Sequence, residues 1–131
     1  VEDSFSKCVG LTALPKTISK WAKVEDLILA KCKRLTQLPD EVGELKALCW
    51  LDLRNCKNLK NLPETMGNLG DLRHLDLSTC KSLETIPVSL EKLTGRLKVV
   101  DVSCCLSLKL EPSTLSALQT ALIGWPPEGK K

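Results

Sequence analysis

The chain has 131 residues, of which 43% are hydrophobic and 27% charged, and its formal net charge is only +3. So weak a charge gives no argument for nucleic acid or an anionic membrane surface as a partner. No apolar run approaches the roughly 18 residues that a membrane-spanning helix needs, so we expect no membrane partner either.

One pattern, L-x-L-x-x-C-x-x-L-x-x-L-P, recurs through the chain. It is complete in Leu51–Pro63 and returns upstream over 27–39 and downstream over 75–87, where Ile86 replaces the last leucine. The cysteines of these three units lie 24 residues apart. A fixed period of this length is typical of a solenoid, in which each unit buries its apolar side only against its neighbours.

The period divides the chain into five repeats of 24–25 residues, with approximate bounds 1–23, 24–47, 48–71, 72–96 and 97–121. The first is degenerate, because Asp3 takes the place of its first strand leucine. The last gains one residue near Gly95 and carries Glu111 where the others have Leu or Ile, so we expect an irregular loop there.

Both ends of the chain lead to expectations about what limits the solenoid. A sixth unit begins at Leu122, and its period places Trp125 in the first strand-leucine position, where it would cap the last repeat. The domain would then cover 1–125, with a polar C-terminal tail over 126–131. The amino end carries no comparable cap, so we expect more repeats or another domain before Val1.

Each unit predicts a short strand followed by a helical turn. The alternation in L-x-L points both leucines to one side of a strand, and successive strands must run parallel. The proline fits the first position of a short helical turn, and Gly43 and Gly67 would let that turn unwind. The predicted fold is α/β: a curved solenoid with a parallel sheet on the concave face and short helical or 3-10 turns on the convex face.

Seven cysteines suggest disulfides until their positions are compared. Five share one position of the repeat and form a predicted buried structural column: Cys8, Cys32, Cys56, Cys80 and Cys105. The odd total and the single column favour reduced thiols and therefore an intracellular location, in the cytoplasm or also the nucleus. Because the column is a line rather than a tetrahedron and contains no histidine, we predict no metal site.

The positions between the strand leucines face solvent on the concave sheet, which is the usual binding surface of such a solenoid. Trp50 is the sharpest candidate, as a tryptophan on a solvated strand face resembles a protein-binding hot spot. The alternative is that Trp50 only shields the sheet by packing on its neighbours. The predicted partner-binding residues are Trp50, Asp52, Arg54, Asn55, His74, Asp76, Ile28, Asp26 and Asp101.

Charged columns on this face allow two interpretations each. Asp52, Asp76 and Asp101 lie on adjacent strands and would either pair with basic residues of a partner or be solvated and relieved locally. A basic column at Lys33, Lys57 and Lys81 would orient a partner or form a solvated edge.

His74, Asp76 and Ser78 also raise the possibility of a hydrolase. An open sheet excludes no water, however, so we predict no enzyme and no cofactor.

The repeats are identified as leucine-rich repeats. Within that class, the cysteine column followed by L-x-x-L-P and then G-x-L resembles plant intracellular disease-resistance receptors, most closely over Leu48–Pro87. The resemblance implies recognition of a protein partner, such as an effector, a co-receptor or the receptor's own nucleotide-binding module. No G-x-x-x-x-G-K-[ST] phosphate loop occurs in this chain. The alternative is a stand-alone intracellular scaffold, similar to plant Ras-interacting repeat proteins, that binds a small GTPase or a ubiquitin-system component. We expect the isolated fragment to be monomeric.

Overall fold

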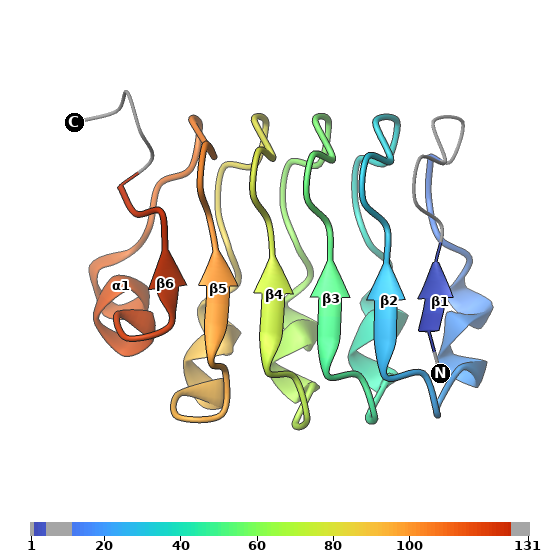
Figure 1. Ribbon diagram of the computed structural model, residues 1–131. Coiled ribbons are helices and arrows are strands. Elements are labelled where there is room, and N and C mark those ends of the chain that lie inside the picture. Colours follow the sequence, from blue (N-terminus) through green and yellow to red (C-terminus); the bar gives the residue numbers. More distant parts are fainter. Residues whose placement is uncertain (1, 5–11, 127–131) are drawn as a thin grey trace.

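The computed structural model describes residues 2–4 and 12–126. Its strands form one sheet of six, in chain order and parallel throughout (Figure 1). They are β1 (Glu2–Ser4), β2 (Asp26–Ile28), β3 (Trp50–Asp52), β4 (His74–Asp76), β5 (Val99–Asp101) and β6 (Leu122–Ile123). The prediction of a solenoid with a parallel sheet on its concave face is confirmed.

Short helices connect the strands and line the opposite face of the solenoid (Figure 1). Four are 3-10 helices: η1 (Lys16–Lys20), η2 (Asp40–Glu44), η3 (Glu64–Asn68) and η4 (Val88–Leu93). Each begins one residue after its proline, whose backbone is extended, so the expected proline at the first helical position is wrong for these four. The proline carbonyl instead accepts the bond that closes the first turn, as from Val42 N to Pro39 O at 3.0 Å.

The core is a rod of side chains enclosed between the sheet and the helices. Strand leucines pair in register across neighbouring strands, so each lies beside the same residue type of the next repeat. The position of the first strand leucine in each repeat is fully buried in four successive strands, at Leu27, Leu51, Leu75 and Val100. This continuity makes each repeat depend on its neighbours for burial.

Gly43 and Gly67 have a different role from the one we expected. Both lie within 3-10 helices and are buried, and neither has a positive φ. A Cβ on Gly67 would come within 2.6 Å of the Ser89 Cβ, and one on Gly43 within 2.5 Å of the Thr65 carbonyl oxygen. These glycines therefore allow successive convex helices to approach closely, and the expectation that they unwind the turn is wrong.

The fifth repeat ends differently from the others. Glu111 is exposed before Pro112, whereas Leu38, Leu62 and Ile86 are buried at this position in the other repeats. An α-helix, α1 (Pro112–Leu118), then takes the place of the 3-10 helix, with Thr114 and Leu118 buried one α-helical turn apart. Leu122, the first strand residue after this helix, lies 10 residues after Pro112, whereas the equivalent Leu75 lies 12 residues after Pro63.

This shorter connection changes the register of the last strand. Leu122, rather than Trp125, pairs with Val100 in the first strand position. The predicted position of Trp125 is therefore wrong, although its half-buried side chain does pack against the core.

Candidate functional site

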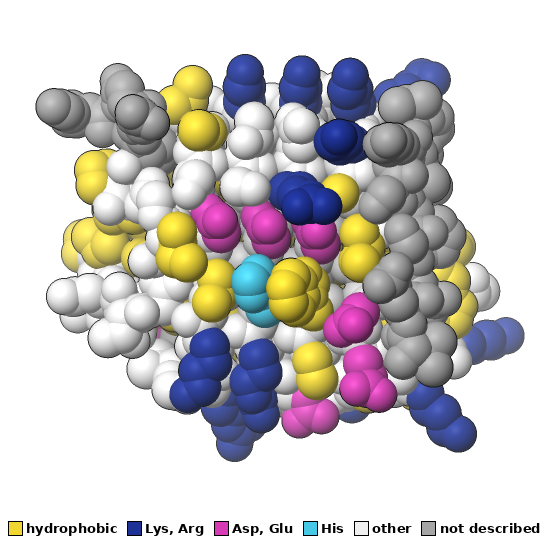
Figure 2. Space-filling view, in the orientation of Figure 1, with side chains coloured by type: hydrophobic (Ala, Val, Ile, Leu, Met, Phe, Trp, Pro, Cys, Tyr) yellow, Lys and Arg dark blue, Asp and Glu magenta, His cyan; other side chains and the backbone are white. Residues whose placement is uncertain are grey.

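The centre of the concave face is a stacked pair of rings (Figure 2). Trp50 and His74 are in register on β3 and β4. Their ring centroids lie 3.9 Å apart with an interplanar angle of 7°. Trp50 nevertheless keeps 42% of its surface exposed. Half-buried Asp26 follows in the same row on β2. Packing on a neighbour and availability to a partner are therefore both properties of this tryptophan.

Asp52 is the most enclosed of the carboxylates whose burial is described on this face, with 5% of its surface exposed. Its Oδ1 accepts the Arg54 backbone N–H at 3.1 Å, and its Oδ2 lies 3.5 Å from Arg54 Nε. Burial raises the pKa of this carboxyl group, and the attraction of Arg54 only partly offsets that effect. Asp52 is thus already paired within its own repeat.

Asp76 and Asp101 continue the same row across β4 and β5 (Figure 2). Each uses Oδ1 to accept a backbone N–H two residues on, from Ser78 and Ser103 respectively, at 2.9 Å. Among the described residues, neither carboxylate has a cationic partner. Half-buried Ile28 occupies the equivalent position on β2. The three aspartates therefore stabilise the turns after β3, β4 and β5, and two of them carry uncompensated charges.

The residue before each of the four described column cysteines has a left-handed backbone, a feature that sequence reasoning missed. Lys31, Asn55, Thr79 and Cys104 have φ between 61° and 67°. This conformation directs the Asn55 N–H to the Ser78 carbonyl at 2.8 Å, which extends the pairing beyond the strand. An asparagine in this position was an available signal, because asparagine tolerates the left-handed region. The Asn55 Oδ1 is buried, and no hydrogen-bond donor reaches it within the described part of the chain.

The cysteine column lies inside the solenoid and links successive repeats. Cys56, Cys80 and Cys105 each direct Sγ to a strand-leucine carbonyl of the preceding repeat, at 3.2, 3.0 and 2.9 Å. Burial raises the pKa of Cys56 to about 12 and of Cys105 to about 11, and it also raises that of Cys80. Cys32 is fully buried as well, and Cys8 lies outside the described residues. These thiols are structural donors rather than nucleophiles.

The contacts around His74 do not assemble a hydrolytic centre. The Ser78 hydroxyl donates to Asp76 Oδ1 at 2.8 Å rather than to His74, whose ring stacks on Trp50. Within residues 2–4 and 12–126, no group of three or more His, Cys, Asp or Glu side chains is placed to hold a metal ion.

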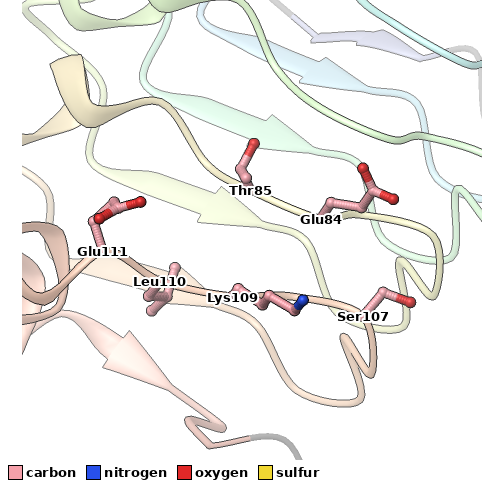
Figure 3. Close-up of a pocket in the computed structure, with 6 residues that line it drawn as sticks. All are labelled: Glu84, Thr85, Ser107, Lys109, Leu110 and Glu111. Carbon is pink, nitrogen blue, oxygen red and sulfur yellow. The ribbon is translucent and has the colours of Figure 1, made fainter.

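A hollow of about 620 Å³ lies away from the concave face, between the loops of the fourth and fifth repeats (Figure 3). Its lining residues are Glu84, Thr85, Ser107, Lys109, Leu110 and Glu111. Figure 3 shows them spread along two neighbouring loop segments rather than converging on one point. The hollow therefore offers no catalytic arrangement.

Basic residues border the concave face on two sides (Figure 2). Lys33, Lys57 and Lys81 are exposed just beyond the cysteines, and Arg73 and Lys98 are exposed immediately before β4 and β5. The acidic row thus lies between two basic margins. No helix in the described part of the chain is long and apolar enough to cross a membrane.

Comparisons with known proteins agree with this architecture. The family model described as Leucine Rich Repeat matches residues 47–69 and 71–93. A solved leucine-rich-repeat protein of Leptospira interrogans aligns with 86% of this chain and is 33% identical to it, with a TM-score of 0.72. The leucine-rich-repeat domain of the type III effector XopL also aligns with 86% of the chain, at 26% identity and a TM-score of 0.71.

These alignments define the class of protein. The chain is built of leucine-rich repeats and has the leucine-rich-repeat fold, an architecture that serves as a protein-interaction module. It spans 27% of the Leptospira chain and 38% of the effector chain. No curated protein matches the sequence.

Proposed function

We propose that the chain is a recognition module whose concave face binds a protein partner around Trp50. The observation that carries this proposal is the stack on His74, which fixes the orientation of the Trp50 ring while 42% of the tryptophan surface stays exposed. Tryptophan is among the residues most enriched at binding hot spots. A ring that is already ordered loses less conformational freedom when a partner covers it, so more of the contact energy becomes affinity.

We further propose that this module is the repeat domain of a plant disease-resistance receptor in the cytoplasm, and that the isolated fragment is a monomer. The buried cysteine column and the L-x-x-L-P and G-x-L segments of residues 48–87 support this origin. The partner would then be an effector, a co-receptor or the receptor's own nucleotide-binding module.

A stand-alone scaffold that binds a small GTPase or a ubiquitin-system component is the second candidate. It is favoured by the similarity to a bacterial repeat protein and to the repeat domain of a type III effector. Sequencing the transcript upstream of Val1 separates the two origins. A nucleotide-binding module with its phosphate loop supports the receptor, whereas a start codon close to Val1 supports the scaffold.

Site-specific photocrosslinking tests the binding face itself. A photoreactive residue replaces Val99, which lies half-buried on the concave face beside His74, or Val88, which is 47% exposed on the convex helix η4. With a candidate partner, we expect crosslinks from position 99 that disappear in Trp50→Ala, and none from position 88. Crosslinks from position 88 alone would place binding on the convex side and refute the proposal.

A further inference from the structure

The acidic row of the concave face differs from strand to strand in the charge it leaves available. On β2 to β6 the positions that align across the sheet are Ile28, Asp52, Asp76, Asp101 and Ile123. Asp52 is paired with Arg54 and buried, whereas Asp76 and Asp101 are half-buried and have no cationic partner among the described residues. Uncompensated negative charge is therefore concentrated over β4 and β5.

Apolar side chains lie at the end of this row and in the next row of the face (Figure 2). Ile123 follows Asp101 on β6 and is 47% exposed, and the Trp50–His74 stack lies in the neighbouring row, two residues back along β3 and β4. The exposure of Trp50 is a second observation, separate from the charges. It indicates that a partner would be desolvated on the same surface. The available carboxylates therefore have one apolar neighbour across the strands, Ile123, and another along them, the Trp50–His74 stack.

The basic margins determine how a partner segment crosses the sheet. Arg73 and Lys98 lie immediately before β4 and β5, and Lys57 and Lys81 lie beyond the ends of β3 and β4. A cationic segment that ran along the strands would approach one of these margins and be repelled. A segment that runs across the strands, along the acidic row, keeps its charge over Asp76 and Asp101.

We propose that the partner presents an arginine from an extended segment that crosses the strands, with its guanidinium bridging Asp76 and Asp101. This inference rests on the proposed function and adds the chemistry of the partner. Adjacent strands lie about 4.8 Å apart, a separation that the planar fork of arginine spans better than the single ammonium of lysine.

The same spacing positions two apolar residues of the partner relative to the arginine. Ile123 lies about 7 Å from the midpoint of the two carboxylates, one and a half strand spacings away. Trp50 lies about 10 Å away, because it is also two residues back along its strand. At about 3.3 Å per extended residue, and because only every second side chain of an extended segment faces the sheet, the partner places one apolar side chain two positions from the arginine toward Ile123 and another two to four positions from it toward Trp50.

A random peptide display library, selected on the immobilised 131-residue chain, tests this chemistry. We expect the retained peptides to carry an arginine with apolar neighbours at those offsets. Replacing the arginine by citrulline, which has the same shape without the charge, should weaken binding by about tenfold. The double variant Asp76→Asn/Asp101→Asn should weaken the arginine peptide similarly and no longer distinguish it from the citrulline peptide.

The variants are chosen to keep the fold and to match their charge change. Asparagine retains the Oδ1 that accepts the Ser78 and Ser103 backbone N–H groups, so the turns after the strands persist. Asp40→Asn/Glu44→Gln, in the convex helix η2, makes the same change in net charge and should leave binding unaltered.

Three results would overturn the inference, and they differ in what they say about the proposed function. Peptides without arginine, or an arginine peptide matched by its citrulline form, refute the arginine site; loss of binding in Trp50→Ala would still support the concave face. Binding that is indifferent to Trp50→Ala as well refutes both proposals. Failure to retain any peptide also counts against both.

Discussion

Replacing Gly67 by alanine tests whether the convex helices depend on close backbone approach. The added Cβ would lie 2.6 Å from the Ser89 Cβ and 2.8 Å from the Ser89 carbonyl oxygen. Carbon atoms in contact prefer about 3.5–4.0 Å, so η3 and η4 must move apart by roughly 1 Å. Overpacking of this kind costs about 1–3 kcal/mol, and the reduced freedom of the unfolded chain returns about 0.4–1 kcal/mol. We expect a net destabilisation of about 1–2 kcal/mol.

Urea denaturation followed by circular dichroism measures this effect as a lower midpoint with an unchanged slope. Gly70→Ala is the matched control, because its nearest contact is a flexible Arg96 nitrogen at 3.6 Å and its φ is not positive. We expect this control to be neutral or slightly stabilised. In Gly67→Ala/Ser89→Gly the clash with the Ser89 Cβ disappears, so the two changes should couple favourably. A Gly67→Ala protein as stable as wild type would refute the packing role of this glycine.

Three further predictions follow from the hydrogen bonds and pKa shifts. In the native protein, a thiol reagent should label exposed Cys104 and should label Cys56 at least about a thousandfold more slowly. The reason is that a pKa of about 12 instead of 9.0 lowers the thiolate fraction of Cys56 by that factor. Peptide mass spectrometry measures the two rates, and equal labelling rates would show that the column is not buried. Burial raises the folded-state pKa of Asp52, so on raising the pH the unfolded chain releases this proton before the folded chain does. The free energy of unfolding of Asp52→Asn should therefore rise relative to that of wild type between about pH 3 and pH 7. A relative fall would mean that Arg54 outweighs burial. Glu91→Ala removes the acceptor of the Ser113 and Thr114 hydroxyls. Because Thr114 is buried, we expect chemical denaturation to show a loss of about 1–3 kcal/mol in the free energy of unfolding. The control Glu84→Ala, at an exposed position, should change it little.

The regular part of the fold was predictable because burial and period act together. L-x-L at a 24-residue spacing allows one arrangement in which every leucine meets a leucine of the next unit, and Leu27, Leu51 and Leu75 are in that register. The last strand was not predictable in this way. Its register depends on whether residues 112–118 form an α-helix or a 3-10 helix. One of the two residues that the α-helix buries, Thr114, is polar and therefore does not appear in a hydrophobic pattern.

The same distinction applies to Gly43 and Gly67. Sequence reasoning recognised that the two share a column, but it assigned them to the conformation of their own turn. The requirement comes instead from the neighbouring repeat, whose Thr65 and Ser89 approach the glycines through space. The repeat period identifies which residues are equivalent. The structural constraint on those residues depends on contacts between neighbouring repeats.

The acidic row shows how a uniform repeat produces a site that is not uniform. Asp52, Asp76 and Asp101 all accept the N–H two residues on, so their structural role is the same in each repeat. The residue that donates this N–H differs: it is Arg54 in one repeat and a serine in the next two. The arginine neutralises its own aspartate, while the serines leave theirs charged. The scaffold therefore keeps the carboxylates in line, and variation one column away determines which of them remain available to a partner.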